Sequence, residues 1–248
     1  MSERIFYKYC PYNQFSLELL INQEAWYAKP ASFNDPFDGE FEISEDITVD
    51  DLLQSVGMDS TNDRYDDYKS LLTHLDGNLR KEEREKEIAR ARDFVEVYKN
   101  IGVLCLSRKK DSILMWSHYA GDHKGFNIEF EVPADIPVLP VIYEERLTPR
   151  HIRDIYAPSS AGFIHIAYSK HIDWKYEEEW RLSVNRGDRI GPLPGKIRGI
   201  NFGLRMPDQH KKTIYNIVSK ISPDIVCKSA VRTGNLLSLS FTGYESGT

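Results

Sequence analysis

The sequence has few of the features that mark secreted, membrane-spanning or metal-clustering proteins. Its 248 residues include only three cysteines, Cys10, Cys105 and Cys227. Far apart and odd in number, they provide neither a CxxC pair nor an obvious disulfide framework. No apolar run approaches the roughly 20 residues of a transmembrane helix, and the N-terminus lacks the apolar region of a signal peptide. We therefore expect a reduced, cytoplasmic protein that does not associate with membranes.

Several common catalytic motifs are also missing. There is no GxGxxG loop, no GxxxxGK[ST] loop and no GxSxG nucleophile elbow, so a Rossmann site, a P-loop site or an elbow serine is not supported. His118 and His123 are five positions apart, which is not the HExxH spacing of zinc proteases. Asp173-Trp174-Lys175 resembles half of a metal-nuclease signature, but so short a pattern is common by chance. No single motif assigns a reaction.

Charge is distributed unevenly along an otherwise ordinary globular composition. Hydrophobic residues make up 41% of the chain and charged residues 28%. Residues 1–76 hold 5 Lys/Arg against 16 Asp/Glu, whereas residues 170–234 hold 13 Lys/Arg against 7 Asp/Glu. A basic C-terminal third is suited to a phosphate-bearing ligand or a nucleic acid. Because no run of Lys/Arg is long, mutual neutralisation or a solubilising surface explains the same asymmetry.

Apolar periodicity predicts an α+β protein with a mostly antiparallel β-core, single or split. We expect one domain over residues 1–248 with a helical insertion at 45–100. The charged first half of its longest helix, residues 80–87, should face water. Residues 32–38 and 191–195 read as loops, and residues 150–170 are ambiguous between helix and loop. Strands are expected at 5–9, 26–28, 103–107, 125–132, 138–143, 179–184, 197–202, 224–227 and 236–241, and further helices at 14–22 and 208–221.

The segment Trp174–Leu182 holds three consecutive glutamates between aromatic and apolar residues. On an extended strand, Glu177, Glu179 and Arg181 would share one face, while Glu178, Trp180 and Leu182 would share the other. Two neighbouring carboxylates and a guanidinium can keep one carboxylate ready to bind a hydroxyl or stabilise a cation. A solvated, charged strand edge explains the pattern equally well.

Two further clusters have a functional and a structural interpretation. In Met115–Gly125, His118 and Asp122 would form an i,i+4 pair on a helix, and the aromatic residues could stack on a base or nicotinamide ring. Alternatively, Trp116 and Tyr119 simply pack a turn. In Ser32–Phe37, Asn34 and Asp35 are expected to bond nearby backbone amides, with Phe33 and Phe37 anchoring the loop to the core as structural support.

The order of these motifs resembles an uncharacterised, mostly bacterial family, domain of unknown function 2971 (DUF2971). The resemblance rests on Tyr7-Lys8-Tyr9, Ser32–Phe37, Met115–Tyr119 with His123–Phe126, and Trp174–Leu182. It covers most of the chain outside the helical section. The family name implies no activity, but its setting implies a toxin or an anti-phage effector with a neutralising partner.

The layout is also similar to that of ADP-ribosyltransferases, which cleave NAD and transfer ADP-ribose. Those enzymes have a split, mostly antiparallel β-core with an early strand bearing His or Arg and a middle strand bearing Ser or Tyr. A late strand begins at a Glu, often within Glu-x-Glu. Here Glu177 and Glu179 fit the late motif and Val103–Ser107 the middle strand, whereas Tyr7 and Tyr9 replace the early His or Arg.

The resemblance implies a role for each candidate residue. Glu179 would bind the ribose 2′-hydroxyl and stabilise the developing oxocarbenium ion, and Glu177 would orient or deprotonate the acceptor. NAD would be the substrate, and an unknown protein or nucleic acid the acceptor of ADP-ribose. The residues expected to contact NAD are Tyr7, Tyr9, Ser107, His118, Tyr119 and Arg181, with Arg181 or a lysine of the basic third on the pyrophosphate.

Two alternatives remain open. A metal-dependent nuclease would use the acidic groups of Glu177, Glu179 and Asp173. In a non-catalytic binding or regulatory protein, the Glu/Arg cluster would instead be an ion-pair network.

Overall fold

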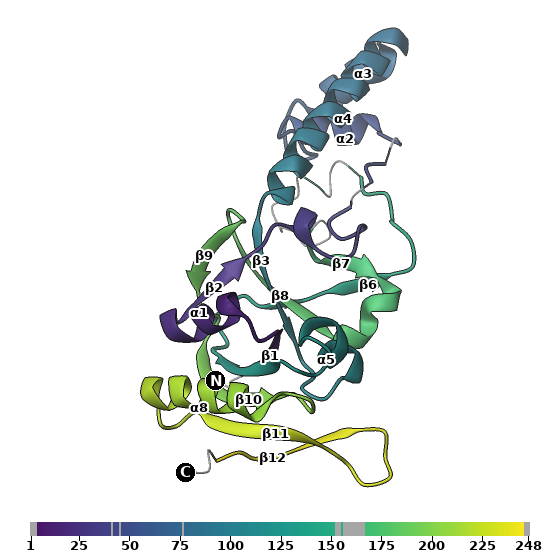
Figure 1. Cartoon of the computed structure of the whole chain (residues 1–248). Coiled ribbons are helices and arrows are strands. Elements are labelled where there is room, and N and C mark those ends of the chain that lie inside the picture. The colour runs from purple at the N-terminus through teal and green to yellow at the C-terminus, as the bar shows by residue number, and fades with distance from the viewer. Residues whose placement is uncertain are drawn as a thin grey trace. The chain divides into compact units, whose positions relative to one another are not determined.

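Eight short strands, with apolar and polar residues alternating along them, assemble into one sheet (Figure 1). Its spatial order is β12-β11-β10-β4-β1-β3-β8-β5, and every neighbouring pair is antiparallel except β10 and β11. This sheet confirms the expected α+β class with a mostly antiparallel core. The strands are β1 (Arg4–Cys10), β3 (Gly102–Ser107), β4 (Phe126–Val132), β5 (Leu139–Pro140), β8 (Glu179–Val184), β10 (Lys196–Phe202), β11 (Val226–Arg232) and β12 (Leu239–Gly243).

The computed structural model describes residues 4–40, 42–44, 46–75, 77–151, 155 and 167–245. The chain divides into two compact units, each made of separate stretches. The first unit comprises residues 1–28, 102–141 and 173–248, and the second comprises residues 29–101 and 142–172. The segment 45–100, expected as a helical insertion, falls within the second unit. No helix in the described part of the chain is long and apolar enough to cross a bilayer.

One face of the large sheet forms the main apolar core of the first unit. The alternation predicted for β4 is confirmed, because Phe126, Ile128, Phe130 and Val132 are all fully buried. Two helices contribute to this core, α1 (Gln14–Asn22) and α8 (Asp208–Ile221). Asn13 caps α1 by accepting a 2.9 Å hydrogen bond from the Ser16 amide, which satisfies one of the amides left free at a helix start. Their buried residues are Leu19, Leu20, Ile214 and Val218.

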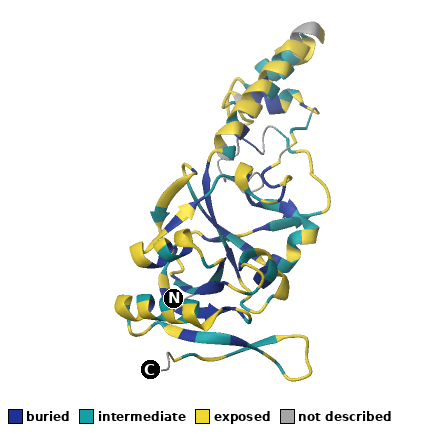
Figure 2. Cartoon of the chain, in the orientation of Figure 1, coloured by how far each residue is buried: buried dark blue, intermediate teal, exposed yellow. Residues whose placement is uncertain are grey.

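The opposite face of the sheet carries a smaller, aromatic cluster. It is built around Tyr9 of β1 and around Met115 and Trp116 of helix α5 (Ile113–Tyr119). The Tyr9 and Trp116 rings meet edge to face at 5.1 Å, a favoured geometry for aromatic pairs. Strand β3, which has a neighbouring strand on each side, is coloured mostly as buried (Figure 2).

The second unit is mostly helical, as the sequence indicates. A capping box opens α2 (Val49–Ser55), since the Thr48 and Asp51 side chains each accept a hydrogen bond from the other residue's amide. The small core of the second unit contains Ile47, Leu52, Ala91 and Ile155. Apart from residues 150, 151, 155 and 167–170, the ambiguous stretch 150–170 lies outside the described residues. Within the described residues of this unit, the named elements are the 3₁₀ turn η1 (Pro30–Ser32), α2 (Val49–Ser55), α3 (Tyr65–His74), α4 (Gly77–Lys99), β6 (Ile142–Glu144) and β7 (Ser169–His171).

The loop expected at residues 191–195 begins inside a strand, so this expectation is wrong in part. Arg189–Pro192 forms β9, which pairs antiparallel with β2 (Glu24–Tyr27). The Tyr27 hydroxyl donates a 2.7 Å hydrogen bond to the Pro192 carbonyl. Proline is compatible with a strand that has a free edge. Because glycine and proline are also typical of loops, the composition of this segment predicted a loop instead of a strand.

Gly125 should tolerate no side chain. A Cβ there would overlap the Cys10 carbonyl oxygen and lie 2.8 Å from the Ala120 carbonyl oxygen. Because rigid backbone must shift, we expect Gly125→Ala to lower the free energy of unfolding by about 1–3 kcal/mol. Urea denaturation measures this. Gly243→Ala is the control, since a Cβ at Gly243 meets no atom within 4 Å; equal stability losses in both variants would contradict the packing argument.

Candidate functional site

The glutamate-rich segment does not run as one strand, which corrects the sequence prediction. Residues Ile172–Glu177 form a 3₁₀ turn, η2, and Glu178 has a left-handed φ of 42°. Strand β8 begins only at Glu179, so Glu177 is not on its face. The expected alternation holds from there on: Glu179 and Arg181 point to the aromatic face, while Leu182 belongs to the apolar core and Trp180 packs against it.

Three neighbouring strands place candidate residues from distant parts of the chain in one row. Tyr7 of β1 lies opposite Ser107 of β3, and Ser107 lies opposite Glu179 of β8. On the other side of β1, Tyr7 lies opposite Glu129. Directly opposed residues of antiparallel strands have their side chains on the same face. The sheet therefore aligns Glu129, Tyr7, Ser107 and Glu179 across the aromatic face.

Glu179 is held by a two-point ion pair inside the protein. Arg181 Nε donates to Glu179 Oε1 at 2.8 Å and Arg181 Nη2 donates to Glu179 Oε2 at 3.1 Å. The Glu179 residue is only 4% exposed and Arg181 is fully buried. Cys105 lies opposite Arg181, where burial and the Glu179 carboxylate raise the pKa of its thiol well above the usual value. The carboxylate is thus fixed in orientation and its charge is compensated.

Glu177 is the second buried carboxylate of the cluster. Its residue is 3% exposed, and the Tyr119 hydroxyl donates a 2.6 Å hydrogen bond to Oε1. Ser107 holds the same turn, because its Oγ donates to the Glu177 carbonyl at 2.6 Å and accepts from the Lys109 amide at 3.0 Å. The buried Ser107 hydroxyl therefore joins two segments of the protein, and we interpret it as a positioning group rather than a direct contact to NAD.

Aromatic side chains surround the Glu177 turn. His118 Nδ1 and the Tyr176 hydroxyl form a 2.9 Å hydrogen bond, and the Tyr176 ring lies 6.0 Å from that of Trp174.

The expected helical pair between His118 and Asp122 is wrong, because α5 ends at Tyr119 and Asp122 has a φ of 56°.

The two tyrosines of β1 remain protonated at neutral pH. Burial, then the nearby Glu129 carboxylate, raises the pKa of Tyr7 to about 12. Burial also raises the pKa of Tyr9, whose hydroxyl donates to the Lys109 carbonyl at 2.8 Å. Both groups can therefore act only as neutral hydrogen-bonding phenols.

Sequence reasoning missed Tyr176 and the segment Arg108–Lys110. Tyr176 lies within the glutamate-rich segment, but only a turn there brings it to His118. Arg108, Lys109 and Lys110 follow Ser107 directly, a short basic run that a search for long ones passes over. Arg181, in contrast, is fully buried. Because it is also paired to Glu179, Arg181 is poorly placed for its expected contact to a diphosphate.

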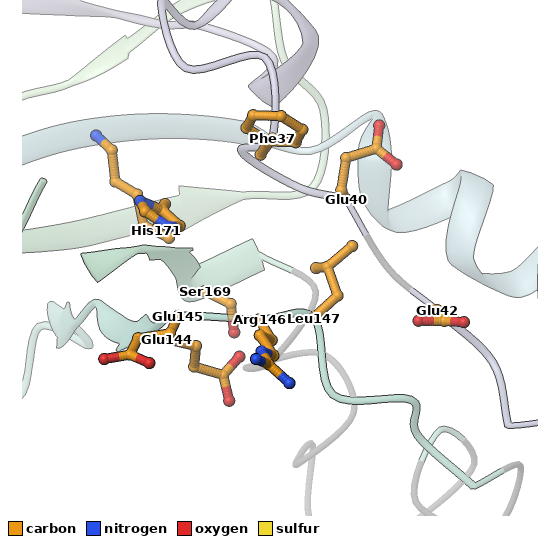
Figure 3. A pocket seen from close by; sticks show the side chains of 10 residues that line it. Phe37, Glu40, Glu42, Glu144, Glu145, Arg146, Leu147, Ser169 and His171 are labelled. Atoms are coloured by element: carbon orange, nitrogen blue, oxygen red, sulfur yellow. The ribbon is translucent and has the colours of Figure 1, made fainter. Parts of the chain in front are cut away.

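The second unit contains a separate pocket of about 490 Å³ (Figure 3). Two of its charges are already compensated: Glu144 pairs with Arg150 at 3.0 Å, and Lys170 lies 3.8 Å from Asp38. Apart from Phe37, the pocket contains none of the residues predicted above. Its lining residues are Phe37, Glu40, Glu42, Glu144, Glu145, Arg146, Leu147, Ser169, Lys170 and His171.

The loop Ser32–Phe37 only partly behaves as expected. Asp35 is buried and its carboxylate accepts a 2.9 Å hydrogen bond from the Phe37 amide, as predicted. The Phe37 side chain, however, is 64% exposed and does not anchor the loop. The loop also belongs to the second unit, whereas the candidate catalytic residues belong to the first.

The described part of the chain contains no group of three or more His, Cys, Asp or Glu side chains suited to a metal ion. The metal-nuclease alternative thus gains no support from the described contacts.

Comparison with known proteins identifies a family without a known activity. Residues 115–182 match the family described as "Protein of unknown function (DUF2971)". The match confirms the predicted family relationship over that segment, which contains most of α5, all of β4 and the start of β8. No curated protein and no solved structure matches the chain significantly.

Proposed function

We propose that this DUF2971-related chain is an NAD-dependent, ADP-ribosyltransferase-like enzyme that transfers ADP-ribose to a protein or nucleic-acid acceptor. The observation that carries the proposal is the row Tyr7, Ser107 and Glu179 across β1, β3 and β8. The enzymes that the sequence resembles carry their site motifs on an early, a middle and a late strand. Here these three strands are neighbours, and the late one begins at the glutamate.

The row has dimensions suited to a ribose-bearing ligand. Tyr7 and Glu179 are two interstrand spacings apart, about 10 Å. Ser107, the residue between them, is small. The Ser107 hydroxyl holds the Glu177 turn, so a ligand would meet the Tyr7 phenol and the Glu179 carboxylate at the two ends of this row.

Glu179 supplies the electrostatic part of the proposed reaction. Cleavage of the bond between nicotinamide and ribose develops positive charge on the ribose. A carboxylate bonded to the 2′-hydroxyl stabilises that charge only as it forms, which lowers the barrier. The Arg181 fork uses two of the roughly four acceptor positions of the carboxylate. The fork sets the orientation of the carboxylate before the substrate binds, and the proposed 2′-hydroxyl would approach this preset carboxylate.

Glu177 and the aromatic residues complete the proposal. Glu177 accepts from Tyr119 through Oε1, and its carboxylate is the base proposed to orient or deprotonate an acceptor group. The rings of Tyr119, Tyr176 and His118 form the aromatic surface proposed to contact nicotinamide. The suggested setting, a toxin or anti-phage effector with a neutralising partner, follows from the family resemblance alone.

One observation favours a different class, a non-catalytic binding or regulatory protein. Glu179 and Arg181 are buried and paired, and such pairs also occur as purely structural networks. The double variant Glu179→Gln/Arg181→Met separates this alternative from the enzyme.

The first test is whether the purified protein releases nicotinamide from NAD. We expect release by the protein alone or with cell lysate, and transfer of label from adenine-labelled NAD to a macromolecule of the lysate. EDTA should not change either signal. No NAD consumption under either condition would contradict the proposal, and EDTA-sensitive cleavage of nucleic acid would favour the nuclease instead.

A further inference from the structure

Strand β12 (Leu239–Gly243) closes one end of the eight-stranded sheet, and its outer edge pairs with no strand in the described part of the chain. Natural proteins usually protect such an edge with charged residues or proline, because its unpaired amides and carbonyls readily pair with another chain. At the opposite end of the sheet, β5 has only two residues and ends in Pro140. Residues 233–244, in contrast, contain no charged residue and no proline. The β12 edge is therefore open to a further strand.

Hydrogen bonds at the two ends of β12 show which backbone groups face outward. The Thr233 amide donates to the Ser238 carbonyl at 3.2 Å, and the Tyr244 amide donates to the Cys227 carbonyl at 2.9 Å. In an antiparallel pair, only every second residue bonds to a given neighbouring strand. The even-numbered residues of this stretch therefore bond to β11, and the odd-numbered residues of β12 direct their amides and carbonyls to the open edge. These residues are Leu239, Phe241 and Gly243.

The turn that joins β11 to β12 carries two exposed leucines. Leu237 is 95% exposed and Leu236 is 68% exposed. Figure 1 shows the hairpin at the outer side of the sheet, with this turn at its free end. A strand that extends along the whole of β12 would also cover the turn, so its binding would bury apolar surface in addition to forming backbone hydrogen bonds.

We infer that a second copy of this chain docks on this edge, with the two β12 strands antiparallel about a two-fold axis. Such an axis brings the same surface of both copies together. With the axis at Phe241, the outward-facing residues pair with one another, Leu239 of one copy opposite Gly243 of the other. Because the strand has no charged residue, no like charges oppose each other when two identical strands pair.

Charges at the two ends of the edge favour this antiparallel arrangement. Arg232 lies opposite Leu239 in the β11–β12 pair, so both side chains are on the aromatic face. Glu245 is two residues beyond Gly243, and continued alternation places it on the same face. Both charged residues are exposed, and neither has an ion-pair partner among the described residues. The antiparallel dimer brings Arg232 of each copy toward Glu245 of the other.

The first test is sedimentation equilibrium of the full chain. We expect the average mass to rise from one chain toward two, and no further, between micromolar and millimolar concentrations, because the two-fold contact occupies both edges. Gly243→Pro removes an outward amide from each copy and should raise the Kd of the dimer about 10- to 100-fold. The matched control is Gly243→Ala, which keeps the amide and adds a Cβ that meets no atom within 4 Å.

A charge exchange tests the orientation of the two strands. Arg232→Glu alone places like charges at both ends of the interface and should raise the Kd of the dimer about 3- to 10-fold at low salt. Adding Glu245→Arg restores opposite charges and should return the Kd to within about twofold of the native value. This variant pair also keeps the inference testable if Gly243→Pro does not fold.

Amide hydrogen exchange locates the contact within the chain. The amides of Leu239, Phe241 and Gly243 should gain protection only at concentrations at which the dimer forms. A protein that is monomeric at every concentration overturns the inference, as does a dimer whose Kd is the same in all these variants. Protection of the three amides in a monomer after addition of cell lysate would also overturn it and indicate a strand from a different protein.

Discussion

Replacing Glu179 with glutamine should reduce both NAD turnover and stability, and a second substitution at Arg181 should restore only stability. Glu179→Gln removes the carboxylate that forms the two-point ion pair with the buried guanidinium of Arg181. Breaking a buried pair in this way costs about 3–5 kcal/mol. If Glu179 stabilises the transition state, turnover should fall about 10²- to 10³-fold as well.

The double variant Glu179→Gln/Arg181→Met separates the two effects. It removes both charges and keeps similar side-chain volumes, and such replacements are often neutral or stabilising. We therefore expect a free energy of unfolding within about 2 kcal/mol of the native value, but turnover as low as in Glu179→Gln. Urea denaturation and nicotinamide release measure the two quantities, and Glu24→Gln, an exposed carboxylate of β2, is the control for both.

The double variant also decides between enzyme and binding module. Turnover that recovers together with stability would mean that Glu179 only neutralises Arg181, and the catalytic role would be lost. A binding or regulatory protein predicts a different result. The native protein would never consume NAD, and the double variant would be stable and would still bind the same ligand as the native protein.

Local patterns predicted most of the fold because each element carries its own signal. Alternation along β4 predicted which side chains are buried, and the apolar spacing of residues 208–221 predicted α8. The pairing of β2 with β9 could not be predicted, because its partners are far apart in sequence and β9 contains Gly191 and Pro192. Only the folded sheet brings such segments together.

The candidate site was predictable in composition but not in geometry. Three consecutive glutamates allow no unique alternation, so the sequence could not show that Glu177 lies in a turn and Glu179 in a strand. The bond between Tyr119 and Glu177 joins residues 58 positions apart. Likewise, the row containing Tyr7 and Ser107 depends on strand register, which pairing across the whole sheet sets.

Glu177→Gln should separate cleavage of NAD from transfer to an acceptor. The buried carboxylate of Glu177 accepts from the Tyr119 hydroxyl at 2.6 Å. A glutamine amide oxygen can accept the same bond, so the stability cost should stay within about 1–2 kcal/mol. Because Glu179 would still stabilise the developing cation, nicotinamide release to water should persist. Loss of the acceptor-activating base should lower the rate of transfer by about 10²- to 10⁴-fold.

The matched variant for this prediction is Tyr119→Phe. It keeps the carboxylate but removes the hydrogen bond from the Tyr119 hydroxyl, so it should destabilise the protein by about 1–3 kcal/mol while transfer continues. Release of nicotinamide without lysate, and incorporation of labelled ADP-ribose with lysate, measure the two reactions separately. If Glu177→Gln lowers both by the same factor, Glu177 acts in cleavage together with Glu179. If it lowers neither, Glu177 only anchors the turn through Tyr119, and acceptor activation must come from another group on the same face of the sheet.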